Sequence, residues 1–265
     1  MNLQTTYSPG WNPTNARELV AFSAAVYNTG WFGGKRLYYL NSDATSTFGI
    51  VVDQGDYVVI VFRGTANPEN LLLDAECYRR DLNMKTPLHG VKVHAGFLTG
   101  YNSVSDAMMR ILSLEKIAGG KVGDRPIFIT GHSYGGALAV LAGLDLQLEG
   151  YNVHSVYTYG QPRVGNGAFA MLVEDTLGDR LQRVVYDNDI VARVPHFPSL
   201  TDPYRHAGVE VLLPENHRPV LNPTPARRLW LEARSAWRAL VVRHTGIFKD
   251  ALDDHHIRNY TRRLA

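Results

Sequence analysis

The sequence Gly-His-Ser-Tyr-Gly at residues 131–135 has the pattern G-x-S-x-G. In this pattern the serine occupies a very tight turn between a strand and a helix, and glycine is needed where neighbouring backbone comes close. The strand-like run 127–130 precedes the motif, and a helical run of small residues, 136–142, follows it. This context favours a functional serine over the alternative, an idle serine in a glycine-rich turn. We therefore predict that Ser133 is a nucleophile.

A serine hydroxyl is a weak nucleophile at neutral pH, so it requires a base, and the base requires an acid that orients it. In proteins with this motif the chain order is Ser, then Asp or Glu, then His. Asp187 and Asp189 both follow an apolar run at 181–186, and spacing alone does not separate them. Among the later histidines, His255 and His256 lie beyond the last predicted strand, where the base is expected.

The elements that must position these residues alternate between strand and helix in the second half of the chain. Hydrophobic periodicity predicts strands at 37–40, 48–53, 56–62, 126–130, 155–159, 181–186 and 208–213, and helices at 15–27, 100–117, 135–148 and 168–177. Thr14 is the predicted N-cap of the first helix, and Gln54-Gly55 is a predicted hairpin turn. The alternation predicts an α/β fold with a central, mostly parallel sheet covered by helices on both faces.

Length and composition are those of one globular domain. The chain has 265 residues, of which 45% are hydrophobic and 20% charged, and we expect a single domain over 1–265. The 27 basic and 25 acidic side chains give a formal net charge of +2, which offers no reason to expect a nucleic-acid partner.

The single cysteine, Cys77, excludes an intramolecular disulfide and a cysteine-rich metal site. Residues 1–15 contain no apolar segment typical of a secretory signal, and the apolar runs are too short to span a membrane. The compartment stays open between the cytoplasm and secretion with a signal absent from this chain.

Five sequence blocks resemble the class 3 lipase family, which is typified by the triacylglycerol lipases of filamentous fungi and has the α/β-hydrolase fold. The blocks follow the family's order over roughly residues 15–260, and the Tyr-Gly-Gln-Pro-Arg-Val-Gly-Asn block is more specific than the serine motif. They are Val61–Thr65, Val93–Phe97, Gly131–Ala137, Tyr159–Asn166 and Asp189–Pro195.

The resemblance implies roles for individual residues. Asp189 matches the family's catalytic acid, which favours it over Asp187, and His255, in an Asp-His block with Tyr260 downstream, matches the base better than His256. Thr65 matches the first oxyanion-hole residue, and the backbone N–H of Tyr134 is the second donor. No metal or organic cofactor is implied.

The resemblance also implies a lid, which we expect within 66–90, where residues 71–73 are leucines that either cover the site or belong to the core. The chain departs from the family in lacking disulfides, in having Ala192 where a proline is usual, and in an insertion at 214–245. Within the insertion, the spacing of apolar residues predicts a basic helix at 226–244 with an apolar stripe that includes Trp230 and Trp237. This stripe either packs on the domain or contacts a lipid interface, and we favour packing.

The resemblance implies a carboxylic ester hydrolase that acts on lipid or other ester substrates, with a triacylglycerol lipase expected first. A phospholipase A1 or a non-lipid esterase on the same scaffold is the alternative within enzymes. A catalytically inactive hydrolase fold that binds lipid is a more distant alternative.

Overall fold

The computed structural model describes residues 3–5, 9–28, 36–65, 79–83, 87–114, 125–186, 189–195, 201–215, 217–231, 233–234, 237 and 252–265. Its helices are α1 (Pro13–Ala25), α3 (Ala95–Leu114), α4 (Tyr134–Leu148), α5 (Gly167–Leu177) and α8 (Ile257–Leu264). Its strands are β1 (Arg36–Ser42), β2 (Thr47–Asp53), β3 (Val58–Phe62), β4 (Arg79–Asn83), β5 (Pro87–His94), β6 (Ile127–His132), β7 (Val153–Tyr159), β8 (Gly165–Asn166), β9 (Leu181–Tyr186), β10 (Tyr204–Arg205), β11 (Val209–Leu213) and β12 (Val220–Leu221).

The central sheet has the strand order β1-β2-β3-β6-β7-β9-β11-β12 among the described residues. The five strands from β3 to β11 are parallel neighbours, whereas β1, β2 and β12 pair antiparallel at the two edges. The predicted turn at Gln54-Gly55 joins β2 and β3, and the backbone N–H of Gln54 donates to the Tyr57 carbonyl at an N···O distance of 3.0 Å. The mostly parallel sheet confirms the predicted fold class.

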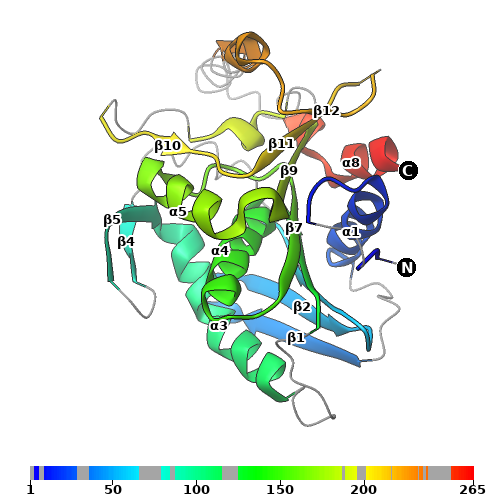
Figure 1. Cartoon of the computed structure of the whole chain (residues 1–265), viewed down its shortest axis with the longest axis vertical. Helices are drawn as coiled ribbons and strands as arrows, with labels where there is room; N and C mark the ends of the chain where they lie inside the picture. Colours follow the sequence, from blue (N-terminus) through cyan, green and yellow to red (C-terminus); the bar gives the residue numbers. More distant parts are fainter. Residues whose placement is uncertain are drawn as a thin grey trace.

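Helices cover both faces of this sheet (Figure 1). Strand β3 shows why, because its side chains alternate between two hydrophobic cores. Val58, Ile60 and Phe62 belong to the core that α3, α4 and α5 cover. Val59 and Val61 belong to the core on the opposite face, which contains residues of α1 and Tyr260 of α8. Helices α1 and α8 lie side by side on that face (Figure 1).

A second, smaller sheet with the order β10-β8-β5-β4 was not predicted. Its strands β8 and β10 are two residues long, which is too short for a periodic pattern, and β5 includes His89 and Gly90. Within the expected lid range, 79–83 and 87–90 are parts of β4 and β5. Residues 66–78 and 84–86, with the three leucines and Cys77, lie outside the described residues, so the lid stays a prediction.

Two helix starts differ from the prediction by more than one residue. The N-cap of α1 is Asn12, not Thr14, because the Asn12 side chain accepts hydrogen bonds from the N–H groups of Thr14 and Asn15 at 2.9 and 3.1 Å. Proline at the first helical position, Pro13, has no N–H to be capped and favours this start. Helix α3 begins at Ala95, five residues before the expected start.

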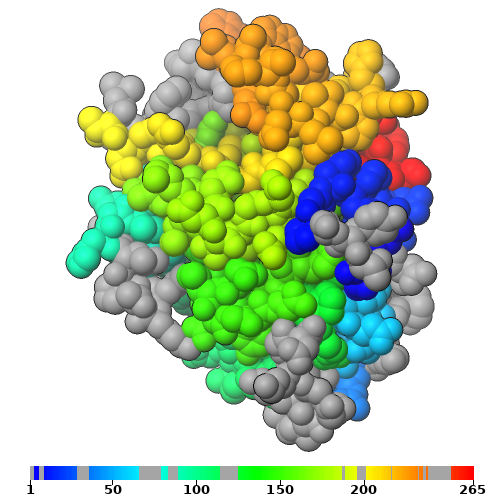
Figure 2. Space-filling view, viewed as in Figure 1, coloured from blue at the N-terminus to red at the C-terminus, as the bar shows by residue number. Residues whose placement is uncertain are grey.

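The insertion at 214–245 is described in part. It contains β12, which pairs with β11, and a helical segment at 225–231. Leu231 is the buried contact of this segment, where it packs with Val185, Ala192 and Leu212. Trp230 and Trp237 are 56% and 67% exposed, so our expectation that their stripe packs on the domain is wrong. The segment forms part of the surface at the top of the space-filling view (Figure 2).

No helix among the described residues is long and apolar enough to cross a membrane.

Candidate active site

The site lies where the parallel strands end. Ser133 follows β6, Gly160 follows β7, and Thr65 lies three residues beyond β3. Asp189 lies three residues beyond β9. The carboxyl ends of parallel strands meet at one edge of a sheet, which is the usual position of ligand sites in open α/β sheets.

Ser133 is held in the strained turn that the motif predicts. Its φ and ψ are 58° and −129°, which is an unfavourable conformation for any residue other than glycine. A side chain at Gly131 would clash with the backbone of Gly135, and one at Gly135 would clash with the Phe62 carbonyl. The Ser133 N–H donates to the Tyr159 carbonyl at 2.9 Å, which fixes the turn to β7.

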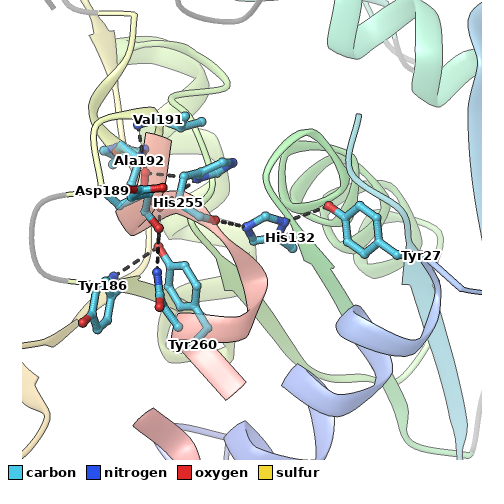
Figure 3. Close-up of polar contacts among 11 residues, drawn as sticks. Tyr27, His132, Tyr186, Asp189, Val191, Ala192, His255 and Tyr260 are labelled. Atoms are coloured by element: carbon cyan, nitrogen blue, oxygen red, sulfur yellow. Dashed lines mark hydrogen bonds and ion pairs between the residues drawn. The ribbon is translucent and has the colours of Figure 1, made fainter. Parts of the chain in front are cut away.

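Asp189 is fully buried, and its carboxylate accepts hydrogen bonds from four groups. Val191 and Ala192 donate their N–H groups to Oδ1 at 2.9 and 3.3 Å, and the Tyr260 hydroxyl donates to Oδ2. Nδ1 of His255 lies 2.9 Å from Oδ2 and 3.0 Å from Oδ1 (Figure 3). Burial alone raises the pKa of Asp189, but His255 and the hydrogen bonds from His255 and Tyr260 outweigh it and lower that pKa.

The contact with Asp189 defines the tautomer of His255. An ionised carboxylate only accepts hydrogen bonds, so Nδ1 of His255 carries a proton and Nε2 of the neutral ring has the free lone pair. His255 is 3% exposed and ends the short 3₁₀ helix Asp253–His255, whereas the side chain of the alternative, His256, is exposed. The structure therefore brings Asp189 together with His255, and Asp187 lies outside the described residues.

Ser133 Oγ and His255 Nε2 are both buried, and neither has a hydrogen-bond partner among the described residues. His132, the neighbour of Ser133, stacks on the His255 ring with 4.6 Å between ring centroids. The serine turn and the imidazole are thus neighbours, but no hydrogen bond joins them in this structure. Such bonds are often long in unliganded enzymes and shorten when substrate binds.

The two residues expected at the oxyanion hole belong to adjoining segments. Tyr134 is the first residue of α4, where backbone N–H groups have no acceptor within the helix and the helix dipole favours negative charge. Gly135 packs against the backbone of Phe62 and Arg63, so the start of α4 contacts the end of β3 that leads to Thr65. Thr65 is half-buried.

Two residues of the site were missed at the level of sequence. The Tyr27 hydroxyl oxygen lies 2.8 Å from Nδ1 of His132, and Nε2 of His132 lies 2.7 Å from the carbonyl oxygen of His255 (Figure 3). The position of His132 beside the predicted nucleophile was a signal for its proximity, but nothing in the sequence pointed to Tyr27. In the described part of the chain, no group of three or more His, Cys, Asp or Glu side chains could hold a metal ion.

Comparisons with known proteins agree with this geometry. The model of the family "Lipase (class 3)" matches residues 59–199. A lipase of Rhizopus niveus is 37% identical over 184 residues, which are 67% of this chain and 44% of that protein. A secreted mono- and diacylglycerol lipase of Fusarium solani is 33% identical over 159 residues, which are 59% of this chain and 44% of that protein.

A solved structure of the triacylglyceride lipase of Rhizomucor miehei superposes with a TM-score of 0.62 at 29% identity, covering 79% of this chain and 82% of that one. The matched region spans 44% of the length of the curated relatives.

The parallel sheet and the serine turn together define an α/β hydrolase. Since the class 3 lipase model matches more than half of the sequence, the chain belongs to the class 3 lipase family.

Proposed function

We propose that this protein hydrolyses carboxylic esters of lipids, most simply triacylglycerols, through Ser133, His255 and Asp189. The observation that carries the proposal is the buried Asp189–His255 pair, which leaves Nε2 of the imidazole without a described partner beside the serine turn. Membership of the class 3 lipase family supports the substrate class. We also propose that 1–265 is one catalytic domain, since helices from α1 to α8 cover the faces of one central sheet.

The reaction proceeds in two steps. Nε2 of His255 accepts the proton of the Ser133 hydroxyl as its oxygen attacks the ester carbonyl, and Asp189 stabilises the imidazolium that forms. The backbone N–H groups of Thr65 and Tyr134 donate to the developing oxyanion. The alcohol leaves with the proton from His255, and an acyl ester on Ser133 remains. A water molecule, deprotonated by His255, then releases the fatty acid.

The test compares three substrate types side by side: emulsified triacylglycerol, phospholipid vesicles and a soluble p-nitrophenyl ester. The wild-type protein should release fatty acid most rapidly from the triacylglycerol, and Ser133→Ala should abolish turnover of all three. Substantial activity in Ser133→Ala would refute the assignment of the nucleophile. Preferential release from phospholipid or from the soluble ester would instead favour a phospholipase A1 or a non-lipid esterase.

A fluorophosphonate probe separates an enzyme from an inactive lipid-binding fold. Such a probe forms a covalent bond with a serine only when a base activates the hydroxyl. We expect labelling of the wild-type protein and none of Ser133→Ala. An unlabelled wild-type protein that still binds lipid would support the inactive module.

We further propose that the helical residues 225–231, 233–234 and 237 of the insertion contact the surface of the lipid substrate. Leu229, Trp230 and Trp237 are 72%, 56% and 67% exposed. Arg227 and Arg234 are exposed beside them, and the Arg234 guanidinium lies 5.2 Å from the Trp230 ring centre. Exposed tryptophan combined with arginine is typical of helices that lie in the interface of an anionic lipid surface.

The contacts of Leu231 support a position of this segment near the proposed site. Leu231 packs against Ala192, whose N–H group also donates to the Asp189 carboxylate. A lipid surface in contact with the segment would thus be close to the loop that carries the acid.

Sedimentation with vesicles tests the contact. The double variant Trp230→Ala/Trp237→Ala should lose binding to vesicles that contain anionic phospholipid, and salt should weaken the binding of the wild-type protein. Tyr39→Ala is the matched control, because Tyr39 is an aromatic side chain, 60% exposed, on the edge strand β1. Equal binding by the double variant and this control would contradict the proposal.

A further inference from the structure

We propose that Tyr27 and His132 are positioning residues that connect the backbone leading to the oxyanion hole with the backbone of the catalytic base. This inference rests on the proposed function and adds two side chains that the reaction above does not use. Neither of them accepts or donates a proton in that scheme. Their effect is transmitted through Gly64 on one side and His255 on the other.

The direction of each hydrogen bond follows from the chemistry of the partners. The His255 carbonyl can only accept, so Nε2 of His132 donates to it across 2.7 Å. His132 is neutral, because burial and the nearby His255 lower its pKa to about 3. Its Nδ1 is therefore an acceptor, and the Tyr27 hydroxyl donates to it across 2.8 Å. Burial raises the pKa of Tyr27, which keeps the phenol protonated for this role.

The series continues beyond Tyr27 to the end of β3. The Gly64 backbone lies against the Tyr27 oxygen, since a Cβ added at Gly64 would clash with that oxygen, and Gly64 directly precedes Thr65. Since the phenol proton is directed to His132, the Tyr27 oxygen is left to accept from the Gly64 N–H, and this backbone interaction lowers the pKa of the phenol. The hydrogen bonds thus run in one direction, from Gly64 through Tyr27 and His132 to the carbonyl of His255.

Four segments that are distant in sequence meet in this series, and Figure 3 shows three of its members, Tyr27, His132 and His255. They are the loop after β3, the turn after α1, the serine turn and the 3₁₀ helix before α8. His132 also stacks on the ring of His255, with an angle of 29° between the ring planes. One side chain, His132, therefore holds both the main chain and the ring of His255.

The geometry argues for positioning rather than for packing alone. His132 is 5% exposed, and an apolar side chain could fill a space of that size without the cost of burying an imidazole. Its two ring nitrogens instead bond to the Tyr27 hydroxyl and to the carbonyl of His255, the proposed base. A displacement of about 1 Å in such groups costs on the order of a hundredfold in rate.

Three substitutions separate the contributions. Tyr27→Phe removes the hydroxyl that joins Gly64 to His132. His132→Leu removes both hydrogen bonds and the stacking, whereas His132→Gln retains an N–H donor that can reach the His255 carbonyl. Each variant is assayed for kcat and KM on a soluble p-nitrophenyl ester, for the rate of fluorophosphonate labelling and for Tm.

We expect His132→Leu to lower both kcat and the labelling rate by about a hundredfold, and Tyr27→Phe to lower both by about tenfold. KM should change by less than about threefold in either variant, because the orientation of the base is lost rather than substrate binding. His132→Gln should recover most of the loss. The double variant Tyr27→Phe/His132→Leu should be no slower than His132→Leu, since both substitutions interrupt one series.

Tyr157→Phe is the structural control. The Tyr157 hydroxyl also joins distant segments, since it accepts from the Asn12 N–H at 2.9 Å and donates to the Gly10 carbonyl at 2.8 Å, but it has no place in the series. The Tm of this variant should be lower than that of the wild type, while its kcat should stay within about twofold of wild type, since only stability is affected.

The inference is overturned if Tyr27→Phe and His132→Leu behave like Tyr157→Phe, that is, if their Tm is lowered but the kcat of the folded protein is unchanged. It is also overturned if the two substitutions act additively or if His132→Gln is as slow as His132→Leu. A wild-type protein that neither turns over esters nor reacts with the probe would refute the proposed function, and the positioning role with it.

Discussion

The Tyr260 hydroxyl donates a hydrogen bond to Oδ2 of Asp189, the same oxygen that lies 2.9 Å from Nδ1 of His255. The phenol oxygen also accepts from the Tyr186 N–H at 3.1 Å, so one side chain of α8 bonds both to the end of β9 and to the carboxylate beyond it. Tyr260 is fully buried, and its ring lies edge-on to those of Tyr159 and Tyr186. The hydroxyl therefore helps to keep Asp189 ionised and in place.

Tyr260→Phe should lower the free energy of unfolding by about 1.5–3 kcal/mol at pH 7, since a buried hydrogen bond to a charged group is lost. The pKa of Asp189 is lowered in the folded protein, so its ionisation stabilises the fold above the ordinary aspartate pKa of 3.8, and this stability is lost as pH falls through the folded pKa. The variant should raise that folded pKa. Urea unfolding should show a difference from wild type that is constant above pH 5 and shrinks below pH 3.8. A difference independent of pH would contradict the role of the hydroxyl.

Gly160→Ala should impair the site directly. Gly160 has a φ of +59°, and an added Cβ would lie 2.6 Å from Oδ2 of Asp189 and 3.0 Å from the His255 ring. We expect kcat for a soluble ester to fall by about tenfold or more, because the acid and base are displaced from each other. Gly178→Ala controls for backbone strain, since Gly178 also has a positive φ, +48°, but its added Cβ would meet nothing within 4 Å. Equal kcat in the two variants would disprove the steric argument.

The stability of the protein should depend on pH through His132. Its pKa is lowered to about 3 in the fold from an ordinary value of 6.5, so between these values the unfolded chain binds a proton that the folded one does not. The free energy of unfolding should therefore fall as pH decreases from 6.5, with a slope from this residue of up to about 1.4 kcal/mol per pH unit. His132→Gln should lack that part of the slope. Denaturant titrations between pH 4.5 and 7 measure it, and identical slopes in both proteins would contradict the prediction.

Sequence alone predicted the parts of this site that depend on local pattern. The strained turn at Ser133 follows from five residues and the periodicity on either side of them, and the mostly parallel sheet follows from the alternation of strands and helices. The choice of Asp189 over Asp187 came from a family resemblance, because two carboxylates in one loop have the same local pattern.

The remaining features depend on contacts between distant segments. Tyr27 approaches His132 across 105 positions of sequence, and no local signal records such a contact. The two-residue strands β8 and β10 exist because β5 and one another supply their partners. The exposure of Trp230 and Trp237 could not be inferred either, since the same helical spacing serves packing and lipid contact.

Glu210→Gln should destabilise the fold by about 3–5 kcal/mol without affecting chemistry, because a buried guanidinium would lose its counter-charge. Glu210 is 4% exposed and bonds to Arg183 at 3.0 Å and to Arg228 at 3.1 Å, which joins β11, β9 and the insertion. Asp202→Asn is the comparison, since the pair of Asp202 with Arg79 is more exposed and should contribute about 1 kcal/mol or less. Chemical denaturation measures both, and equal losses would show that burial does not set the strength of these pairs.

The contact between α1 and α8 has a consequence for engineering this hydrolase. Helix α8 begins two residues after His255 and carries Tyr260, and it packs against α1, which contributes no group to the proposed reaction. Trimming or fusing at α1 would thus remove the support beneath the proposed base while Ser133, His255 and Asp189 all remained present. Fusion partners and immobilisation tags are better attached to β1, which is the edge strand at the end of the sheet opposite β11 and β12.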